Sequence, residues 1–425
     1  MTITYTTPIL RNLTCPHCWT TIKPEEMLFV SEHIDLLGDS KLGSDQPIRF
    51  RPTRFTVQGE AIDAKGFPCL RLACPNCHLQ IPRASLEMPA HFLSIFGAPG
   101  SGKSYYLASM TWEMRRRVGE EFRLAFNDAD PEMNQHLNEY EEALFVNSRG
   151  AESIPLGDLI RKTETQGDLY ASVNFGNQNV IYARPFLFTL QPRNDHPQAK
   201  QAENLARVIC LYDNAGESFQ PGADTAANPV TRHLARSRAL MFVFDPLQDV
   251  RFRQAASLMD KPRVLSRQEP VLQEAASRVR RYAGLSSRGQ HDRPLIVVLT
   301  KADQWIEPIL GGFPEGEPLR TVVHNERRMN GIDLNAIEQF SAKVREQLLK
   351  ISPEIIAAAE SFCKEVIYIP TSAVGSHVVV DPETGLDRIR PAETAPQWVT
   401  VPMFYALART TKGLVPIVGP RRRSL

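Results

Sequence analysis

Short, continuous apolar runs recur along the chain from residue 92 onward. Runs of this length without polar alternation are typical of strands that are covered on both faces. Stretches with a helical spacing of apolar residues lie between several of these runs, at residues 105–118, 131–144, 273–282, 334–350 and 402–410. Strand alternating with helix predicts an α/β fold with a mostly parallel sheet and helices on both faces. The predicted strands are residues 92–96, 185–190, 208–212, 239–244, 295–299 and 366–369.

The sequence before residue 91 has a different character and is predicted to be a separate unit, residues 1–90, before a larger domain at residues 91–425. It contains two C-x-x-C pairs, Cys15 with Cys18 and Cys74 with Cys77. A two-residue spacer lets both thiolates face one ion, so two such pairs complete a closed tetrahedral Zn²⁺ site. A site with four cysteine ligands leaves no position for water, which indicates a structural role.

The gap between the two pairs is longer than the usual spacing of a zinc ribbon. We therefore expect a small zinc-ribbon-like β domain with an insertion that is rich in strands near residues 48–57 and 68–73. Cys69, His17 and His78 are alternative ligands, and the four-cysteine set is the simpler one. The remaining alternative is a group of cysteines that bind no metal.

The composition of the chain limits which partners and which cellular compartment we expect for it. The chain has 425 residues, with 49 lysines and arginines against 48 aspartates and glutamates. This balance gives no global reason to expect binding to nucleic acid or to a membrane surface. No apolar run is long enough to span a bilayer, and the N-terminus lacks the pattern of a secretion signal. We therefore expect a cytoplasmic protein, in which the spacing of the seven cysteines indicates metal binding before disulfides.

A glycine-rich segment follows the first predicted strand of the larger domain and matches the G-x-x-x-x-G-K-[ST] phosphate loop. Its glycines let the backbone turn tightly, so that N–H groups converge on a phosphate, and the following helix adds its positive N-terminal end. Lys103 is expected to reach the β- and γ-phosphates, and the Ser104 hydroxyl is expected to bind Mg²⁺. The predicted phosphate-binding residues are Gly97, Ala98, Pro99, Gly100, Ser101, Gly102, Lys103, Ser104 and Tyr105.

Three later strands also lead into polar residues, at the end where an open parallel sheet binds its ligands. Each segment alone is a weak signal, because aspartate and threonine are common at strand ends. All of them in this order, on these strands, indicate a single ligand site. The segments are Asp213-Asn-Ala-Gly216-Glu217, Thr300-Lys301-Ala-Asp303 and Thr371-Ser372-Ala373.

With these motifs in this order, the sequence resembles the P-loop GTPases of the translation-factor and small-GTPase class. The resemblance implies a Ras-like P-loop NTPase fold that binds GTP or GDP with Mg²⁺. By analogy with that class, Asp213 would hold Mg²⁺ through water and the Gly216 N–H would sense the γ-phosphate. Asp303 would accept two hydrogen bonds from the guanine edge while Lys301 packs across the ring. The rest of the implied guanine site is Thr300, Ser372 and Ala373.

The zinc pairs in front of this domain resemble more narrowly those of the bacterial double-GTPase families, which are thought to act in paired or multigene systems. This second resemblance covers the N-terminal unit and is looser than the first. It implies a protein partner, and a second GTPase is one candidate.

Two features depart from the pattern of the GTPase class. Glu217 stands where small GTPases usually have the glutamine that orients the attacking water, and its charge adds repulsion beside the γ-phosphate. The switch threonine that closes over Mg²⁺ does not align, and Thr163 and Thr165 are candidates within a long insertion at about residues 119–184. An arginine finger would come from Arg161, from Arg184 or from a partner.

The sequence thus predicts a slow, Mg²⁺-dependent GTPase that acts as a nucleotide-dependent switch, with Lys103, Glu217, Thr163 and Thr165 as candidate catalytic residues. One alternative is a GTP-binding scaffold or sensor with negligible hydrolysis, which Glu217 favours. A second is a P-loop ATPase, against which the guanine-edge carboxylate of Asp303 argues. A third is a zinc-ribbon protein that binds nucleic acid. The near-neutral charge argues against it, although a local basic face would escape a whole-chain count.

Overall fold

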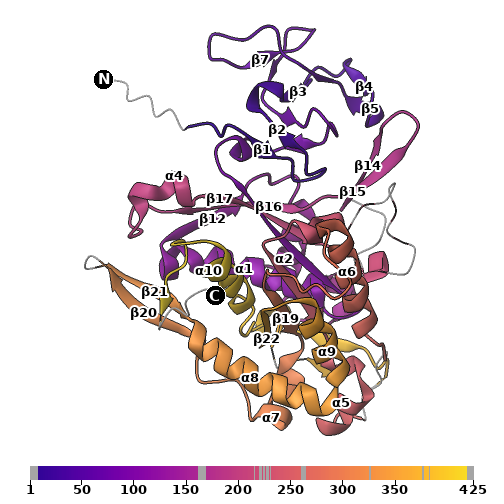
Figure 1. The fold of residues 1–425 in the computed structure, drawn as a ribbon, viewed down its shortest axis with the longest axis vertical. Coiled ribbons are helices and arrows are strands. Elements are labelled where there is room, and N and C mark those ends of the chain that lie inside the picture. Colours follow the sequence, from indigo (N-terminus) through magenta and orange to yellow (C-terminus); the bar gives the residue numbers. More distant parts are fainter. Residues whose placement is uncertain are drawn as a thin grey trace.

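The computed structural model describes residues 8–160, 169–214, 216–219, 223, 225, 229, 231–259, 265–324, 327–375, 378–381 and 383–418. The structure is mixed α/β, with a seven-stranded sheet in the larger domain and a small β-rich module above it (Figure 1). In spatial order, the sheet consists of β12 (Leu124–Asp128), β16 (Phe186–Pro192), β17 (Arg207–Asp213), β11 (Ala90–Gly97), β18 (Ala239–Phe244), β19 (Leu295–Leu299) and β22 (Val366–Pro370). Strand β16 is antiparallel to both of its neighbours, and the other neighbouring pairs are parallel. The mostly parallel sheet is therefore confirmed.

Every strand predicted for this sheet is present within two residues of its expected bounds, whereas the edge strand β12 was not predicted. In β12, the buried Leu124 and Phe126 alternate with the more exposed Ala125 and Asn127. Such alternation is weak over so short an edge strand, which differs from the continuous apolar runs of the central strands. The expected insertion at residues 119–184 thus contributes a strand to the main sheet.

One face of the sheet is covered by α1 (Lys103–Phe122) and α10 (Val401–Thr410). The two helices contact each other through Phe122 and Phe404, whose ring centroids are 4.4 Å apart. At the far edge, α8 (Leu334–Ile351) packs along β22, and α9 (Pro353–Phe362) lies between α8 and α6 (Glu269–Ala283).

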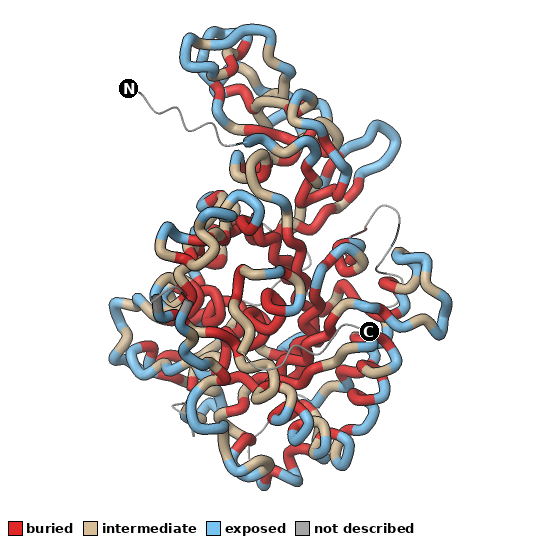
Figure 2. Tube along the Cα trace, turned by 60° about the vertical axis from the view of Figure 1, so that its left-hand side comes forward, coloured by how far each residue is buried: buried red, intermediate tan, exposed pale blue. Residues whose placement is uncertain are grey.

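The opposite face is covered in two different ways. The short helices η4 (Gly216–Phe219) and η5 (Arg232–Ala235), with α6 behind them, cover the carboxyl half of β11, where Phe219 packs on Phe96. Over β16, β17 and β11, the cover is the N-terminal module together with the hairpin β14 (Tyr170–Asn174) and β15 (Asn179–Ala183). Figure 2 shows buried segments running from the base of the module into the larger domain. The prediction of helices on both faces is therefore wrong for this half of the sheet.

The other elements are short and surround these layers. The N-terminal module contains β1 (Leu13–Thr14), β2 (Thr21–Ile22), η1 (Pro24–Glu26), β3 (Leu28–Val30), β4 (Leu37–Asp39), β5 (Gly43–Pro47), β6 (Arg49–Phe50), β7 (Ala61–Ile62), β8 (Pro68–Cys69), β9 (Leu72–Ala73), β10 (Gln80–Ile81) and η2 (Arg83–Leu86). The larger domain adds α2 (Gln135–Phe145), β13 (Ile154–Pro155), α3 (Leu156–Leu159), η3 (Ala199–Gln201), α4 (Ala202–Leu205), η6 (Pro246–Gln248), α5 (Val250–Ala255), α7 (Ala302–Leu310), β20 (Leu319–His324), β21 (Arg327–Asp333), β23 (Val379–Val380), β24 (Asp387–Ile389), η7 (Pro391–Glu393) and β25 (Ile417–Val418). None of the helices that the structure describes has both the length and the apolar character needed to cross a membrane.

Candidate functional site

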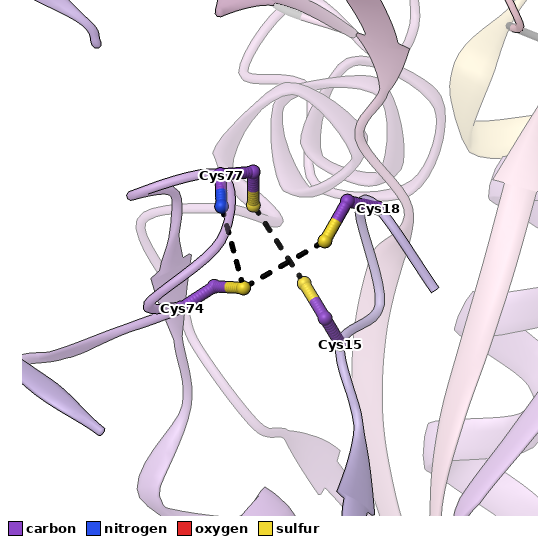
Figure 3. Close-up of side chains that lie close together, drawn as sticks. All are labelled: Cys15, Cys18, Cys74 and Cys77. Atoms are coloured by element: carbon purple, nitrogen blue, oxygen red, sulfur yellow. Dashed lines mark hydrogen bonds between the residues drawn. The ribbon is translucent and has the colours of Figure 1, made fainter. Parts of the chain in front are cut away.

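The two C-x-x-C pairs fold into turns of the same shape. In the first turn the Trp19 N–H donates to the Cys15 carbonyl at 3.1 Å, and in the second the His78 N–H donates to the Cys74 carbonyl at 2.9 Å. Trp19 and His78 both adopt the left-handed conformation, with φ of 60° and 61°, which is uncommon for residues other than glycine. Two turns that agree this closely direct the sulfur atoms of both pairs toward one centre (Figure 3).

The four sulfur atoms all lie within 4.8 Å of one another, with Cys15 and Cys77 at 3.8 Å and Cys18 and Cys74 at 3.7 Å. Tetrahedral ligands at the usual Zn–S distance of about 2.3 Å are about 3.8 Å apart, so the cluster fits Zn²⁺ as it stands. Burial raises the pKa of the Cys15 and Cys77 thiols well above the ordinary value. A bound cation would stabilise the thiolate forms and offset this cost of burial.

The alternative ligands face elsewhere. The Cys69 thiol lies 3.8 Å from a carboxylate oxygen of Asp63, and His17 Nε2 is 2.9 Å from the Gln80 carbonyl. His78 Nδ1 is 2.9 Å from the Asp39 carboxylate. The structure therefore brings together the four predicted cysteines and leaves the three substitutes outside the cluster.

The first C-x-x-C turn is hydrogen-bonded directly to the central sheet. The Trp19 Nε1–H donates to the Tyr212 hydroxyl at 3.0 Å, and that hydroxyl in turn donates to the Pro16 carbonyl. Tyr212 is fully buried in β17 and immediately precedes Asp213. Residues between and beside the four clustered cysteines therefore contact the strand that ends in the predicted Mg²⁺ aspartate.

A buried polar network continues from Tyr212 to the end of this strand. The ring of His233 stacks on Tyr212, with centroids 4.1 Å apart, and is fully buried. Its Nε2 atom lies 2.9 Å from Asn214 Oδ1, and its Nδ1 atom lies 2.5 Å from the Ser94 hydroxyl of β11. The first C-x-x-C turn, Asn214 and the strand before the phosphate loop thus share one set of buried contacts.

The phosphate loop adopts conformations and contacts that require its glycines. Gly100 and Gly102 have φ of 71° and 88°, in the left-handed region. A Cβ atom at Gly97 would lie 2.3 Å from the Val243 carbonyl oxygen, so a side chain there is excluded by the neighbouring strand. Gly102 stands at the N-terminus of α1, whose first N–H groups face the loop.

Side chains on and around the loop fix its shape. The Lys103 ammonium donates to the Gly97 and Ala98 carbonyls at 3.0 Å each and is largely buried. The Thr300 hydroxyl donates to the Ser101 carbonyl at 2.7 Å, and the Gln248 amide donates to the Pro99 carbonyl at 3.2 Å. The loop is therefore held from β19 and from η6 as well as by its own lysine.

Gly216 and Glu217 lie against this loop. A Cβ atom at Gly216 would lie 2.5 Å from Pro99 Cδ and 2.6 Å from Pro99 N, so only glycine fits. Glu217 is half-buried and lines the same cavity as the loop. The carbonyl of Ser218 accepts a hydrogen bond of 2.6 Å from Arg278, a fully buried guanidinium on α6. Arg278 was not singled out from the sequence, where it reads as one more arginine of an amphipathic helix.

The segments after β19 and β22 are joined to each other and to the loop. Lys301 Nζ lies 2.5 Å from the Asp245 carboxylate and 3.5 Å from the Gly100 carbonyl. The buried Ser372 hydroxyl donates to Asp303 Oδ1 at 2.5 Å, which fixes that carboxylate at the start of α7. The three strand-end segments that carry motifs therefore form one connected surface.

These residues line a cavity of about 250 Å³. Twelve of its lining residues belong to the predicted site. Gly97, Ala98, Ser101, Asp213 and Ser372, which were also predicted for the site, are buried and do not line the cavity. The predicted residues that line the cavity are Pro99, Gly100, Gly102, Lys103, Ser104, Tyr105, Gly216, Glu217, Thr300, Lys301, Asp303 and Ala373.

The rest of the lining forms a cap that sequence reasoning missed. Leu156 and Ile160 come from the insertion, and Val374, Val378 and Asp387 come from the segment after β22; Gln304 completes the wall. Strands β13 and β24 pair between these two segments, and the Tyr105 hydroxyl donates to the Leu156 carbonyl. The polar, loop-like sequence on both sides gave no sign of this pairing.

Some predicted residues lie outside the site or outside the described part of the chain. Thr163, Thr165 and Arg161 lie outside the described residues. Arg184 is close enough to lower the pKa of the buried His17, after the larger effect of burial, and is not among the residues that line the cavity. Arg184 therefore lies by the zinc module.

The chain has weak similarity to proteins of known description, and no protein-family model matches it. Over 251 residues it is 25% identical to a protein of Mycolicibacterium smegmatis described as "Putative ESX-1 scaffolding and assembly protein SaeC". The match covers 55% of this chain and 57% of that protein, so the chain spans little more than half the length of this curated relative. A solved structure titled "Signal recognition particle receptor SRb-GTP/SRX complex from Chaetomium thermophilum" matches with a TM-score of 0.23 and 12% identity, over 67% of this chain and 94% of that chain. A likeness this low does not identify a fold.

Proposed function

We propose that the chain binds a guanine nucleotide in the cavity at the carboxyl ends of β11, β17, β19 and β22. One observation supports this most directly: residues from all four motif segments line the same cavity. Lys103 would bind the phosphates, Ser104 would bind the Mg²⁺ ion beside them, and Asp303 would accept hydrogen bonds from the guanine base. The Ser372 hydroxyl on Asp303 and the Lys301 contact with the phosphate loop join the two halves of the site. A carboxylate in this position matches the two N–H donors on the guanine edge, whereas adenine offers one amino group beside the N1 acceptor, which a carboxylate would repel.

The proposed reaction is slow hydrolysis of GTP to GDP and phosphate. The loop N–H groups and the Lys103 ammonium would bind the β- and γ-phosphates, while the Ser104 hydroxyl and, through water, Asp213 would hold Mg²⁺. Bound Mg²⁺ neutralises charge on the phosphate oxygens during transfer. Gly216, packed against Pro99, would present its N–H to the γ-phosphate. A change in the position of this segment between GTP and GDP would supply the switch.

A GTP-binding scaffold with negligible hydrolysis is the second candidate. Glu217 lines the cavity, and a carboxylate there opposes the negative charge of the γ-phosphate. The M. smegmatis relative is described as a scaffolding and assembly protein, which extends to this chain only as a proposal that it works on a protein partner. A second GTPase of a bacterial multi-protein system is one such partner.

The test of guanine selectivity is the substitution Asp303→Asn. Guanine donates two hydrogen bonds to a carboxylate, whereas xanthine has a carbonyl in place of the amino group and matches an amide. Loss of a hydrogen bond to a charged group costs about 1.5–3 kcal/mol, so GTP affinity should fall about 10- to 100-fold while XTP affinity rises. Titration calorimetry with GTP, XTP and ATP measures both changes. Glu307→Gln, on the exposed face of the same helix, is the control, and equal affinity of the wild type for ATP and GTP would reject the proposal.

The two candidate functions differ in what Glu217 does. If its charge only repels the γ-phosphate, Glu217→Gln removes the repulsion and should keep or raise an intrinsic rate of about 10⁻⁴ s⁻¹. Single-turnover hydrolysis of GTP by the wild type, Glu217→Gln and Glu217→Ala measures the effect. A large loss in Glu217→Gln would instead make the carboxylate the catalytic base. Wild type and both variants showing no turnover, alone and with candidate partners, would favour the scaffold.

A further inference from the structure

Four arginines gather at the end of the sheet opposite the cavity. Arg207 is the first residue of β17, Arg238 immediately precedes β18, and Arg293 lies two residues before β19. Arg236 lies in the turn between η5 and β18. Parallel strands place their amino ends at one edge, so these side chains share the edge that the carboxyl-end cavity does not use. We call this set the arginine cluster.

Two members of the arginine cluster are held in place by backbone carbonyls. Arg293 Nη1 donates to the carbonyls of Ala235 and Ser237 at 2.6 Å each, which also places it beside Arg236. Arg207 Nη1 donates to the carbonyls of Asn204 and Ala206 at 2.7 Å each. In both cases Nη1 is fixed, and neither Nε nor Nη2 forms a hydrogen bond within the described part of the chain. The rotamer entropy that a mobile arginine loses on binding is thereby reduced.

The positive charge of the arginine cluster has no counterpart in the described part of the chain. No described carboxylate forms an ion pair with any of the four arginines. Of the acidic residues on neighbouring segments, Asp292 pairs with Lys364 at 2.5 Å and Glu365 pairs with Arg409 at 2.5 Å. These two acids are paired with their own partners, and Glu203, which is exposed four residues before Arg207, forms no ion pair with the cluster.

The four charges also act on one another. Partial burial and then the neighbouring Arg238 lower the pKa of Arg207. Arg293 shows the same effect, with burial first and then Arg238 and Arg236. Arg236 and Arg238 are exposed, whereas Arg207 and Arg293 are half-buried. A folded protein thus keeps four like charges together at an accessible edge, an arrangement that a bound anion would stabilise.

We propose that the arginine cluster is a docking site for an acidic segment of a partner protein and that its arginines bind the side-chain carboxylates of that segment. The planar fork of arginine matches a carboxylate with two parallel hydrogen bonds, and the two half-buried forks are already oriented. Because the chain as a whole is nearly neutral, the electrostatic attraction for an acidic segment should be confined to this edge. This site is independent of the nucleotide cavity and stands whether or not the chain binds GTP.

Nucleic acid fits this edge less well than an acidic protein segment. Affinity for a duplex comes largely from phosphate contacts, and proteins that make about 6–10 of them use more contacts than four arginines can provide. Binding to single strands adds stacking on aromatic rings. The exposed phenylalanines of the described chain lie on the N-terminal module and near the β14–β15 hairpin, as Phe55, Phe67 and Phe175, rather than beside the cluster.

Fluorescence anisotropy tests the docking site on the full-length chain, with a labelled peptide of alternating glutamate and alanine as the probe. The wild type should bind it, and binding should weaken as salt is raised. The double variant Arg236→Glu/Arg238→Glu changes two exposed residues and should weaken binding about tenfold or more. Arg51→Glu, exposed on the N-terminal module and without an ion pair in the described chain, is the matched control and should bind as the wild type does.

Three further measurements decide the outcome. The thermal unfolding midpoint shows that the double variant is folded, and Arg236→Gln, a milder change, repeats the test if it is not. A glutamine–alanine peptide should not bind. The proposal is overturned if the glutamate peptide fails to bind the wild type, if the double variant binds it equally well, or if an oligonucleotide or phosphatidylserine vesicles bind the cluster in its place.

Discussion

Lys103→Ala should nearly abolish binding of GTP and GDP while leaving the fold intact. The ammonium is largely buried between the loop and the start of α1, where it bonds the Gly97 and Ala98 carbonyls. From this position it would bridge the β- and γ-phosphates, and charge-assisted hydrogen bonds of this kind contribute about 1.5–3 kcal/mol each. Losing more than one predicts an affinity at least about 100-fold lower. The sheet should persist, because the loop is also held by Thr300 and Gln248.

Titration calorimetry of GTP with Mg²⁺ measures this loss, and thermal unfolding without nucleotide reports on the fold. Lys343→Ala is the matched control, because Lys343 is exposed on α8 and has no ion pair in the described chain. It removes the same charge and should leave the affinity unchanged. Mg²⁺-dependent GTP binding that survives in Lys103→Ala would place the nucleotide site elsewhere on the molecule.

The parts of the site that were predictable from sequence are those set by local backbone chemistry. Glycines spaced closely before a Gly-Lys-Ser sequence predict a tight backbone turn. In the structure, Gly100 and Gly102 adopt the left-handed backbone conformation, as expected. The motifs at the ends of β17, β19 and β22 were predictable because parallel strands bring their carboxyl ends to one edge. The four clustered cysteines were also predictable, because a two-residue spacer between two ligands is a local constraint on the backbone.

The parts that were missed depend on contacts between distant segments. The cap over the cavity is made when β13 pairs with β24, more than two hundred residues later, and neither segment shows a strand pattern in sequence. The cover of β17 was also missed. An apolar strand shows that both of its faces are buried, but its sequence does not say whether a helix or another module covers them. In the sequence, Tyr212 is indistinguishable from the other core residues of its strand. In the structure, its hydroxyl forms hydrogen bonds with Trp19 and Pro16 of the N-terminal module.

Because the N-terminal module packs on the main sheet, loss of its metal should also affect the larger domain. In sequence, the zinc unit and the phosphate loop look like two separate cores. In the structure, Cys15, Cys74 and Trp19 belong to the same apolar cluster as Tyr212 and Phe92 on the main sheet. Phe92 lies in the strand that leads to the phosphate loop, and Tyr212 precedes Asp213. Disorder in the N-terminal module would therefore expose one face of the strands that lead to the proposed nucleotide site.

Cys74→Ser should abolish stoichiometric zinc binding and unfold the N-terminal module. One thiolate of four is lost, and structural Zn²⁺ sites supply apparent binding energies of about 10–16 kcal/mol in small zinc peptides. Elemental analysis of protein purified without chelator should find about one zinc per wild-type chain and none in the variant. Cys69→Ser is the control, because Cys69 is also fully buried in the module but lies outside the sulfur cluster. Zinc absent from the wild type would reject the site.

The same variant should also weaken nucleotide binding, although no zinc ligand lines the cavity. Coupling between distinct sites is usually worth about 1–3 kcal/mol, so a decrease of about 5- to 150-fold in GTP affinity is expected. Tyr212→Phe isolates the path, because it removes the hydroxyl that joins Trp19 to Pro16 and keeps the ring that stacks on His233. It should retain zinc yet lower GTP affinity in the same direction, by less. Unchanged GTP affinity in both Cys74→Ser and Tyr212→Phe would show that the module rests on the sheet without influencing the Asp213–Gly216 segment.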